Sequence, residues 1–168
     1  MTISMYAASV PVFKQFLGSL SDILDKAEAH ATARKIDPNA LLQARLFPDM
    51  LPLTRQIMIA SDFAKGACAR LAAVDVPKYE DTEQSFSELK ARIAKTLAFI
   101  GTLKPAQIDG SEERDITTSA GPNSKTFKGQ AYLTNYALPQ FFFHTTTAYA
   151  ILRHNGIEIG KKDFIGKA

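Results

Sequence analysis

The chain has 168 residues, of which 46% are hydrophobic and 22% charged, and its formal net charge is +3. These values suit one globular domain over residues 1–168, with a single core that buries about two thirds of the unfolded surface. Basic and acidic residues are interspersed, which argues against nucleic-acid binding, because such proteins gather lysine and arginine on one face.

The chain lacks the sequence signals of export and membrane insertion. No window contains 18 apolar residues, and no basic segment followed by an apolar run opens the sequence. The one cysteine, Cys68, cannot form an intrachain disulfide and lies among alanines, which predicts a buried thiol in a reducing compartment. We therefore expect a cytoplasmic protein with no membrane partner.

The first half of the chain carries two long helical patterns joined by a shorter one. The three patterns cover residues 9–34, 38–46 and 50–73. Pro11 and Pro52 fall in the opening turns of the two long patterns, where a missing N–H costs little. The apolar stripes at helical spacing are Phe13, Phe16, Leu17, Leu20, Leu24 and Ala27 in the first pattern and Leu53, Ile57, Ala60, Ala64, Ala67 and Leu71 in the second.

A third long helix and a polar crossover follow. The helix is expected over residues 82–103, and the crossover occupies residues 104–134. Within the crossover, Gly121-Pro122-Asn123 is a turn signal, and residues 116–118 and 126–132 are expected to flank it as two extended pieces of a hairpin. The apolar stripe of the third helix is Phe86, Leu89, Ile93, Leu97, Ile100 and Leu103.

The fourth long helix is expected over residues 138–154 and has a clear stop. Gly156 follows it, and a glycine at this position adopts the left-handed conformation that ends many helices. Ile157 should then fold back onto Leu152, as in a Schellman motif. The pattern as a whole predicts an all-α four-helix bundle with a short hairpin between the third and fourth helices.

His144 is the most informative polar residue of the last helix. It shares one apolar face with Ala148 and Ile151, so its ring should point into the bundle. The other two histidines, His30 and His154, lie at helix ends, too far from His144 to share a metal ion with it. Ala148 stands one turn after His144 and has no ligand atom. We therefore expect no metal and no cofactor.

Asp62 on the second long helix has two interpretations. It either hydrogen-bonds His144 across the bundle and fixes its tautomer, or it pairs with Lys65 on the wet surface. A carboxylate partner would raise the His144 pKa, whereas burial without an acid would lower it. On the third helix, Glu88 and Arg92 are spaced for an i, i+4 ion pair on the outer side.

Four further residues are candidates for a ligand pocket near His144. Arg45 and Arg153 would hold an anionic substrate, and Tyr6 offers a phenolic partner for His144. Tyr149 and Arg153 are i, i+4 neighbours that either join this pocket or only pack on each other.

Three stretches of the chain resemble a known family. They are residues 46–53, residues 143–149, and residues 152–156 with the following 160–164. Across nearly the whole chain, the sequence resembles an uncharacterised bacterial and fungal family of unknown function. That family is a branch of the DinB-like (damage-inducible, YfiT-like) four-helix-bundle superfamily. The resemblance implies an up-down-down-up bundle that forms a homodimer.

Many members of that superfamily bind a divalent metal through one histidine on the second helix and two histidines, four residues apart, on the last helix. His144 matches one last-helix position, but Ala148 stands at the partner position, and Asp62 lies where the second-helix ligand is expected. The resemblance therefore implies at most a fragment of that metal site, and it argues against the superfamily's metal-dependent thiol-transferase chemistry.

These observations lead to two hypotheses from different classes. The first is a metal-free binding or interaction protein, a homodimer with a small-molecule ligand in a partly polar cleft near His144 and Asp62. The second is an enzyme, a hydrolase or transferase with His144 as general base and Asp62 as the acid that orients it. A degenerate metalloenzyme is a third, weaker hypothesis. The exposure of His144 and the partner of its second ring nitrogen distinguish a catalytic from a structural histidine.

Overall fold

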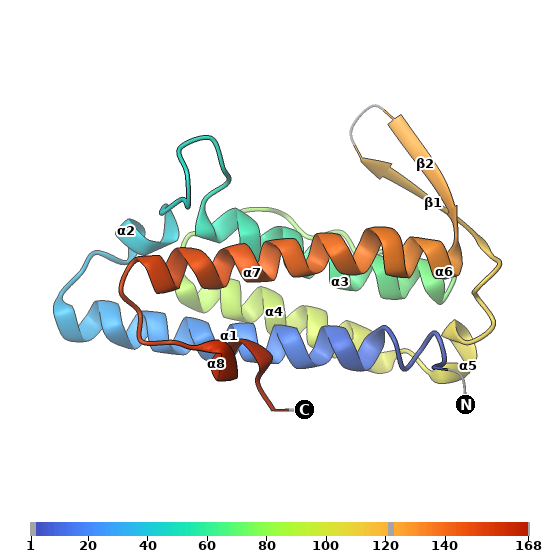
Figure 1. The fold of residues 1–168 in the computed structure, drawn as a ribbon, viewed down its shortest axis with the longest axis horizontal. Coiled ribbons are helices and arrows are strands. Elements are labelled where there is room, and N and C mark those ends of the chain that lie inside the picture. The colour runs from blue at the N-terminus through green and yellow to red at the C-terminus, as the bar shows by residue number, and fades with distance from the viewer. Residues whose placement is uncertain (1–2, 121–122, 168) are drawn as a thin grey trace.

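The computed structural model describes residues 3–120 and 123–167 and shows a bundle of four long helices in two layers (Figure 1). The helices are α1 (Val10–Arg34), α3 (Leu53–Leu71), α4 (Phe86–Thr102) and α7 (Leu138–His154). One layer is α1 with α4, and the other is α3 with α7. The colours in Figure 1 show that α1 and α7 run in one direction and α3 and α4 in the other. The all-α bundle and the implied up-down-down-up order are confirmed.

Because α3 and α4 run in the same direction, the chain must return along the bundle between them. Residues 72–85, called here the return segment, make this connection without regular structure. Helix α4 begins at Phe86, the first residue of its apolar stripe and later than the expected start at residue 82, because Ser85 caps it. The Ser85 hydroxyl accepts the Glu88 N–H at 3.2 Å, and the Glu88 carboxylate accepts the Gln84 N–H at 2.6 Å.

The crossover between α4 and α7 contains the predicted hairpin. After the short α5 (Pro105–Ile108), strand β1 (Asp115–Ala120) pairs in antiparallel fashion with β2 (Asn123–Lys128). The first two residues of the predicted turn, 121–122, lie outside the described residues. The expectation that the second extended piece reaches residue 132 is wrong, because α6 (Gly129–Tyr132) is already helical.

Helix α6 continues into α7 through one π-helical turn, Leu133–Ala137. Pro139 follows this turn, and a proline inside a helix removes one hydrogen bond and crowds the preceding turn. The wider π-helical turn accommodates that disturbance, so the chain enters α7 without a break.

Two short helices complete the fold, one between α1 and α3 and one near the C-terminus. Helix α2 (Pro38–Leu42) is shorter than predicted and is capped by Asp37, whose side chain accepts the Asn39 N–H at 3.0 Å. Near the C-terminus, α8 (Lys161–Ile165) lies against α1, where the Ser19 hydroxyl donates to the Phe164 carbonyl at 2.8 Å. No helix in residues 3–120 and 123–167 has the length and hydropathy needed to cross a membrane.

The stop of α7 has the predicted geometry. Gly156 has φ +89°, and its N–H donates to the Arg153 carbonyl at 3.2 Å. The Ile157 N–H donates to the Leu152 carbonyl at 3.1 Å, and both apolar side chains are buried. The Schellman motif at this position is therefore confirmed.

Replacing Gly156 with alanine is expected to lower the free energy of unfolding by about 1 kcal/mol, because a Cβ is unfavourable at positive φ. The added Cβ would meet no atom within 4 Å, so the backbone conformation alone sets this cost. Gly18 in α1 is the matched control, since it also faces open space, and Gly18→Ala should leave stability unchanged or raise it. Urea denaturation measures both, and a Gly156→Ala protein that unfolds like the parent would contradict the expectation.

Candidate functional site

His144 lies inside the bundle, where α7 packs on α3. Its side chain is 8% exposed, so the predicted inward orientation is confirmed. The ring Nδ1 is 2.7 Å from Oε1 of Gln56, and Gln56 donates its Nε2 to the Leu51 carbonyl at 2.9 Å. Because the amide nitrogen is the donor in that second bond, the amide oxygen accepts from the ring, and Nδ1 carries the proton.

Aromatic rings surround the imidazole of His144. Phe63 stacks on it with 5.9 Å between the ring centroids, and Phe143 meets it edge-on at 5.2 Å. Burial lowers the pKa of His144 below its usual 6.5, so the ring is neutral at pH 7. Among the described residues, none forms a hydrogen bond with Nε2, which is the acceptor nitrogen of this tautomer.

Asp62 turns away from His144. Its Oδ1 lies 2.6 Å from the Lys65 ammonium and 2.8 Å from Nη2 of Arg92. The interpretation in which Asp62 pairs with Lys65 is therefore correct, although the Lys65 side chain is only 7% exposed and is not on a wet surface. The alternative hydrogen bond from Asp62 to His144 is wrong, because Asp62 points toward α4 while Gln56 faces α7.

The remaining predicted pocket residues do not converge on His144 through any contact within the described part of the chain. Each contacts a neighbouring segment instead. Tyr6 donates its backbone N–H to Asp109 at 2.8 Å, Arg45 donates to the Met50 carbonyl, Tyr149 packs on Phe164 with 5.7 Å between centroids, and Arg153 donates to the Ile157 carbonyl at 3.5 Å. The predicted cleft is thus not assembled from these side chains.

The metal-ligating residue types do not cluster either. Within residues 3–120 and 123–167, no group of three or more histidine, cysteine, aspartate or glutamate side chains is arranged to hold a metal ion. His144 uses Nδ1 for Gln56, and the position one turn later, Ala148, carries no ligand atom. The expectation of a metal-free protein stays a prediction that elemental analysis can test.

The outer face of α7 carries an apolar hollow of about 440 Å³. Its lining contains no charged residue and consists of Leu46, Pro139, Phe142, Phe143, Thr146, Thr147 and Ala150. Two of its large hydrophobic side chains are exposed, Phe143 at 54% and Leu46 at 43%. A contiguous apolar surface of this kind is typical of an interaction site.

A second centre, which the sequence analysis did not predict, surrounds Arg92 on α4. Its guanidinium is buried and contacts three carboxylates. Nη1 lies 2.9 Å from Glu83, and Nη2 lies 2.8 Å from Asp62 and 3.0 Å from Asp81. The predicted outer pair of Arg92 with Glu88 is therefore wrong. The return segment supplies Asp81 and Glu83, so this network joins the segment to both α3 and α4.

The environment of this network sets the charge of its members. Burial alone would lower the pKa of Arg92, but the hydrogen bond that Arg92 donates to Glu83 and the charge of Asp62 raise it. Partial burial alone would raise the pKa of Asp81, but the hydrogen bond and charge of Arg55, with the charge of Arg92, lower it. At pH 7 both groups are ionised.

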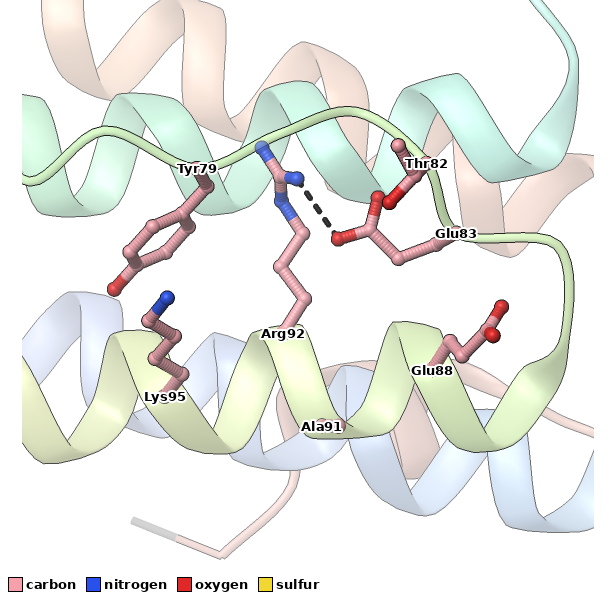
Figure 2. A pocket seen from close by; sticks show the side chains of 7 residues that line it. All are labelled: Tyr79, Thr82, Glu83, Glu88, Ala91, Arg92 and Lys95. Carbon is pink, nitrogen blue, oxygen red and sulfur yellow. Dashed lines mark hydrogen bonds and ion pairs between the residues drawn. The ribbon is translucent and has the colours of Figure 1, made fainter.

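A pocket of about 280 Å³ lies beside this network, between the return segment and α4 (Figure 2). Its lining residues are Tyr79, Thr82, Glu83, Glu88, Ala91, Arg92 and Lys95. The Lys95 and Lys65 ammonium groups lie 4.2 Å and 4.1 Å from the centre of the Tyr79 ring. Burial raises the pKa of Tyr79, so its hydroxyl stays protonated at neutral pH.

The sequence did contain a signal for the burial of Arg92. Leu89, Arg92 and Thr96 fall at i, i+3 and i+7, so Arg92 stands at the edge of the apolar stripe. Leu89 and Thr96 are both buried, with 0% exposure, which places Arg92 on the inner side of α4. The i, i+4 spacing predicted Glu88 as the partner of Arg92, whereas its partners are Asp62, Asp81 and Glu83.

Comparison with known proteins agrees with this fold. The family model described as "Domain of unknown function (DUF1993)" matches residues 5–165. A crystal structure of a DinB family member protein from Shewanella denitrificans is 40% identical and has a TM-score of 0.89, with 97% of this chain and 92% of that chain covered. No curated protein gives a significant match. The chain therefore belongs to the DUF1993 family and has the DinB-like fold that its sequence resembles.

Proposed function

We propose that this chain is a one-domain, metal-free binding protein of the cytoplasm that forms a homodimer and takes a small-molecule ligand. The apolar hollow on α7 is the observation that supports the homodimer. Cys68 supports the cytoplasmic location, because it is a free and fully buried thiol and free thiols persist in reducing compartments. Burial raises the pKa of this thiol, so it is an inert structural side chain.

The partner that fits the hollow best is a second copy of the chain. In a twofold dimer the same patch serves both subunits, so it must offer both a projection and a depression. This surface offers both: Phe143 projects from α7, and the small side chains of Thr146, Thr147 and Ala150 leave the hollow beside it. The absence of charge in its lining also avoids like-charge repulsion between identical faces.

The mass of the protein in solution tests this proposal. Light scattering behind a sizing column should give about twice the 18.4 kDa of the chain for the parent. Phe143→Ser should shift that mass to the monomer, because it removes the projecting ring. Ile165→Ser is the matched control, since Ile165 is 41% exposed but lies on α8, and this variant should remain a dimer. A monomeric parent, or a dimeric Phe143→Ser protein, would refute the proposed interface.

The alternative function is an enzyme that uses His144 as a general base. One observation favours it: Gln56 fixes the proton on Nδ1 and leaves Nε2 as a neutral acceptor. Gln56 then replaces Asp62 as the group that orients the ring. This alternative requires that a substrate can reach Nε2, although His144 is only 8% exposed.

Chemical modification of the histidines separates the two functions. If His144 is structural, diethyl pyrocarbonate should modify it at least about tenfold more slowly than His154, because its imidazole is buried and the His154 side chain is exposed. Peptide mass spectrometry gives the rate at each histidine. A proton NMR titration in the same buffers should place the His144 pKa below 6.5. Modification of His144 as fast as His154 would support the enzyme instead.

A further inference from the structure

The pocket beside Arg92 separates positive from negative charge along α4. Figure 2 shows Lys95 and Tyr79 on one side of the Arg92 side chain and Glu83 and Glu88 on the other. Two cations and two carboxylates line the pocket, so its formal charges cancel while their positions do not. Such a site repels a simple anion at one end and a simple cation at the other.

Two atoms of this wall are buried and have no hydrogen-bond partner among the described residues: Nε of Arg92 and Oε2 of Glu83. Both terminal nitrogens of Arg92 are occupied, Nη1 by Glu83 and the Glu80 carbonyl, and Nη2 by Asp62 and Asp81. Nε therefore remains a donor without an acceptor, while Oε2 remains an acceptor without a donor. Buried polar groups of a native protein are nearly always paired, so these two point to a missing partner.

Two further charged residues of the pocket, one cation and one carboxylate, also lack an ion-pair partner among the described residues. Lys95 lies over the Tyr79 ring and forms no ion pair within residues 3–120 and 123–167, whereas the neighbouring Lys65 is neutralised by Asp62 at 2.6 Å. Glu88 likewise forms no ion pair in that part of the chain, although one of its oxygens caps α4. The two residues are seven positions apart on α4, which places their backbones about 10 Å apart along the helix axis.

We propose that this pocket binds a small zwitterion, a free amino acid or a dipeptide. Its carboxylate lies between the Lys95 ammonium and Nε of Arg92, and its ammonium lies at Glu83 and Glu88. The ligand then supplies the acceptor that Nε lacks and the donor that Oε2 lacks. This inference rests on the proposed function, in which the protein binds a small-molecule ligand, and it assigns the binding site of that ligand to this pocket. It does not depend on the homodimer, because no residue lines both the pocket and the hollow on α7.

Titration with L-alanyl-L-alanine, followed in ¹H–¹⁵N NMR spectra of the full chain, tests the proposal. The dipeptide should shift the amide signals of Tyr79, Glu83 and Lys95 in a saturable way. N-acetyl-L-alanyl-L-alanine and L-alanyl-L-alanine amide each lose one charge, so each should bind at least about tenfold more weakly, which is the effect of losing one charge-assisted hydrogen bond. Alanine itself, titrated in parallel, distinguishes an amino-acid site from a dipeptide site.

Two conservative variants locate the binding. Lys95→Met keeps the aliphatic stem, and Glu88→Gln keeps an oxygen that can cap α4, so the dispersion of the NMR spectrum should remain that of a folded protein. Each variant should bind the dipeptide at least about tenfold more weakly than the parent does. Lys14→Met on the exposed face of α1 is the control and should bind like the parent.

Three results would overturn the zwitterion site. They are the absence of saturable shifts with both the dipeptide and alanine, binding of either singly charged derivative as tightly as L-alanyl-L-alanine, and dipeptide binding to Lys95→Met that equals binding to the parent. The mass of the same samples distinguishes this failure from failure of the dimer. A dimer that binds neither ligand refutes only the pocket, and a monomer that binds the dipeptide refutes only the homodimer.

Discussion

Replacing Arg92 with alanine is expected to lower the free energy of unfolding by about 3 kcal/mol. The guanidinium is buried and lies between the carboxylates of Asp62, Asp81 and Glu83. Removing it leaves those three negative charges close together, with Lys65 still beside Asp62 and Arg55 beside Asp81 but with no cation beside Glu83. It also releases the return segment from α4, because Asp81 and Glu83 both belong to that segment. Urea denaturation followed by circular dichroism gives the change.

Two further variants separate the causes of this loss. Arg34→Ala is the control, because Arg34 is exposed at the end of α1 and forms no ion pair within the described residues, and it should change stability by no more than about 0.5 kcal/mol. Arg92→Met keeps most of the buried stem, so any stability it recovers relative to alanine measures packing and not charge. An Arg92→Ala protein as stable as Arg34→Ala would show that the network contributes nothing.

The same network predicts the direction of the acid response. Asp81 has a lowered pKa in the folded protein, so its contribution is present above the unfolded pKa of about 4 and is lost as the pH falls through the lower folded value. Its side chain is 38% exposed, so solvent screens part of this effect. The loss of stability between pH 5 and about 3 should therefore be smaller in Arg92→Ala than in the parent.

The long helices could be predicted because their apolar stripes are continuous. The stripes of α1, α3, α4 and α7 all fall on buried faces, and the stop at Gly156 needed only local chemistry. The start of α4 was less predictable. The expected start at residue 82 precedes the first residue of the apolar stripe, Phe86. Asp81 and Glu83 are held in the irregular return segment by a tertiary contact with Arg92, and no local rule contains that contact.

The candidate site shows the limit of prediction from one sequence more clearly. The direction of His144 followed from its own helix, but its partner depended on the rotation of α3. Successive residues on a helix point about 100° apart, and Phe63, next to Asp62, is the one that stacks on His144. Gln56, two turns earlier on that same face, thus reaches Nδ1 while Asp62 turns to α4. Rotating α3 by the angle between two successive residues decides whether His144 meets the amide of Gln56 or the carboxylate of Asp62. The spacing of apolar residues does not define the rotation of a helix that finely.

Gly129→Ala is the second large expected effect, a loss of about 3 kcal/mol. Gly129 opens α6 at the base of the hairpin, and a Cβ there would lie 2.0 Å from the carbonyl oxygen of Ser111 and 3.0 Å from its carbon. Neither side can move freely, because Ser111 is fully buried and the Gln130 N–H donates to the neighbouring Glu112 carbonyl at 2.9 Å. The clash must therefore break this junction between the hairpin and α7.

Gly101→Ala in α4 is the matched control for this substitution, since a Cβ at that position meets no atom within 4 Å and the change should be neutral or stabilising. Urea denaturation gives the free energies, and the ¹H–¹⁵N spectrum of Gly129→Ala should show its largest shifts around Ser111 and along β2, whose end is Gly129's neighbour Lys128. The junction is looser than the structure shows if Gly129→Ala unfolds at the same urea concentration as Gly101→Ala. It is as rigid as described if the loss reaches the expected size with the spectrum of α1 unchanged.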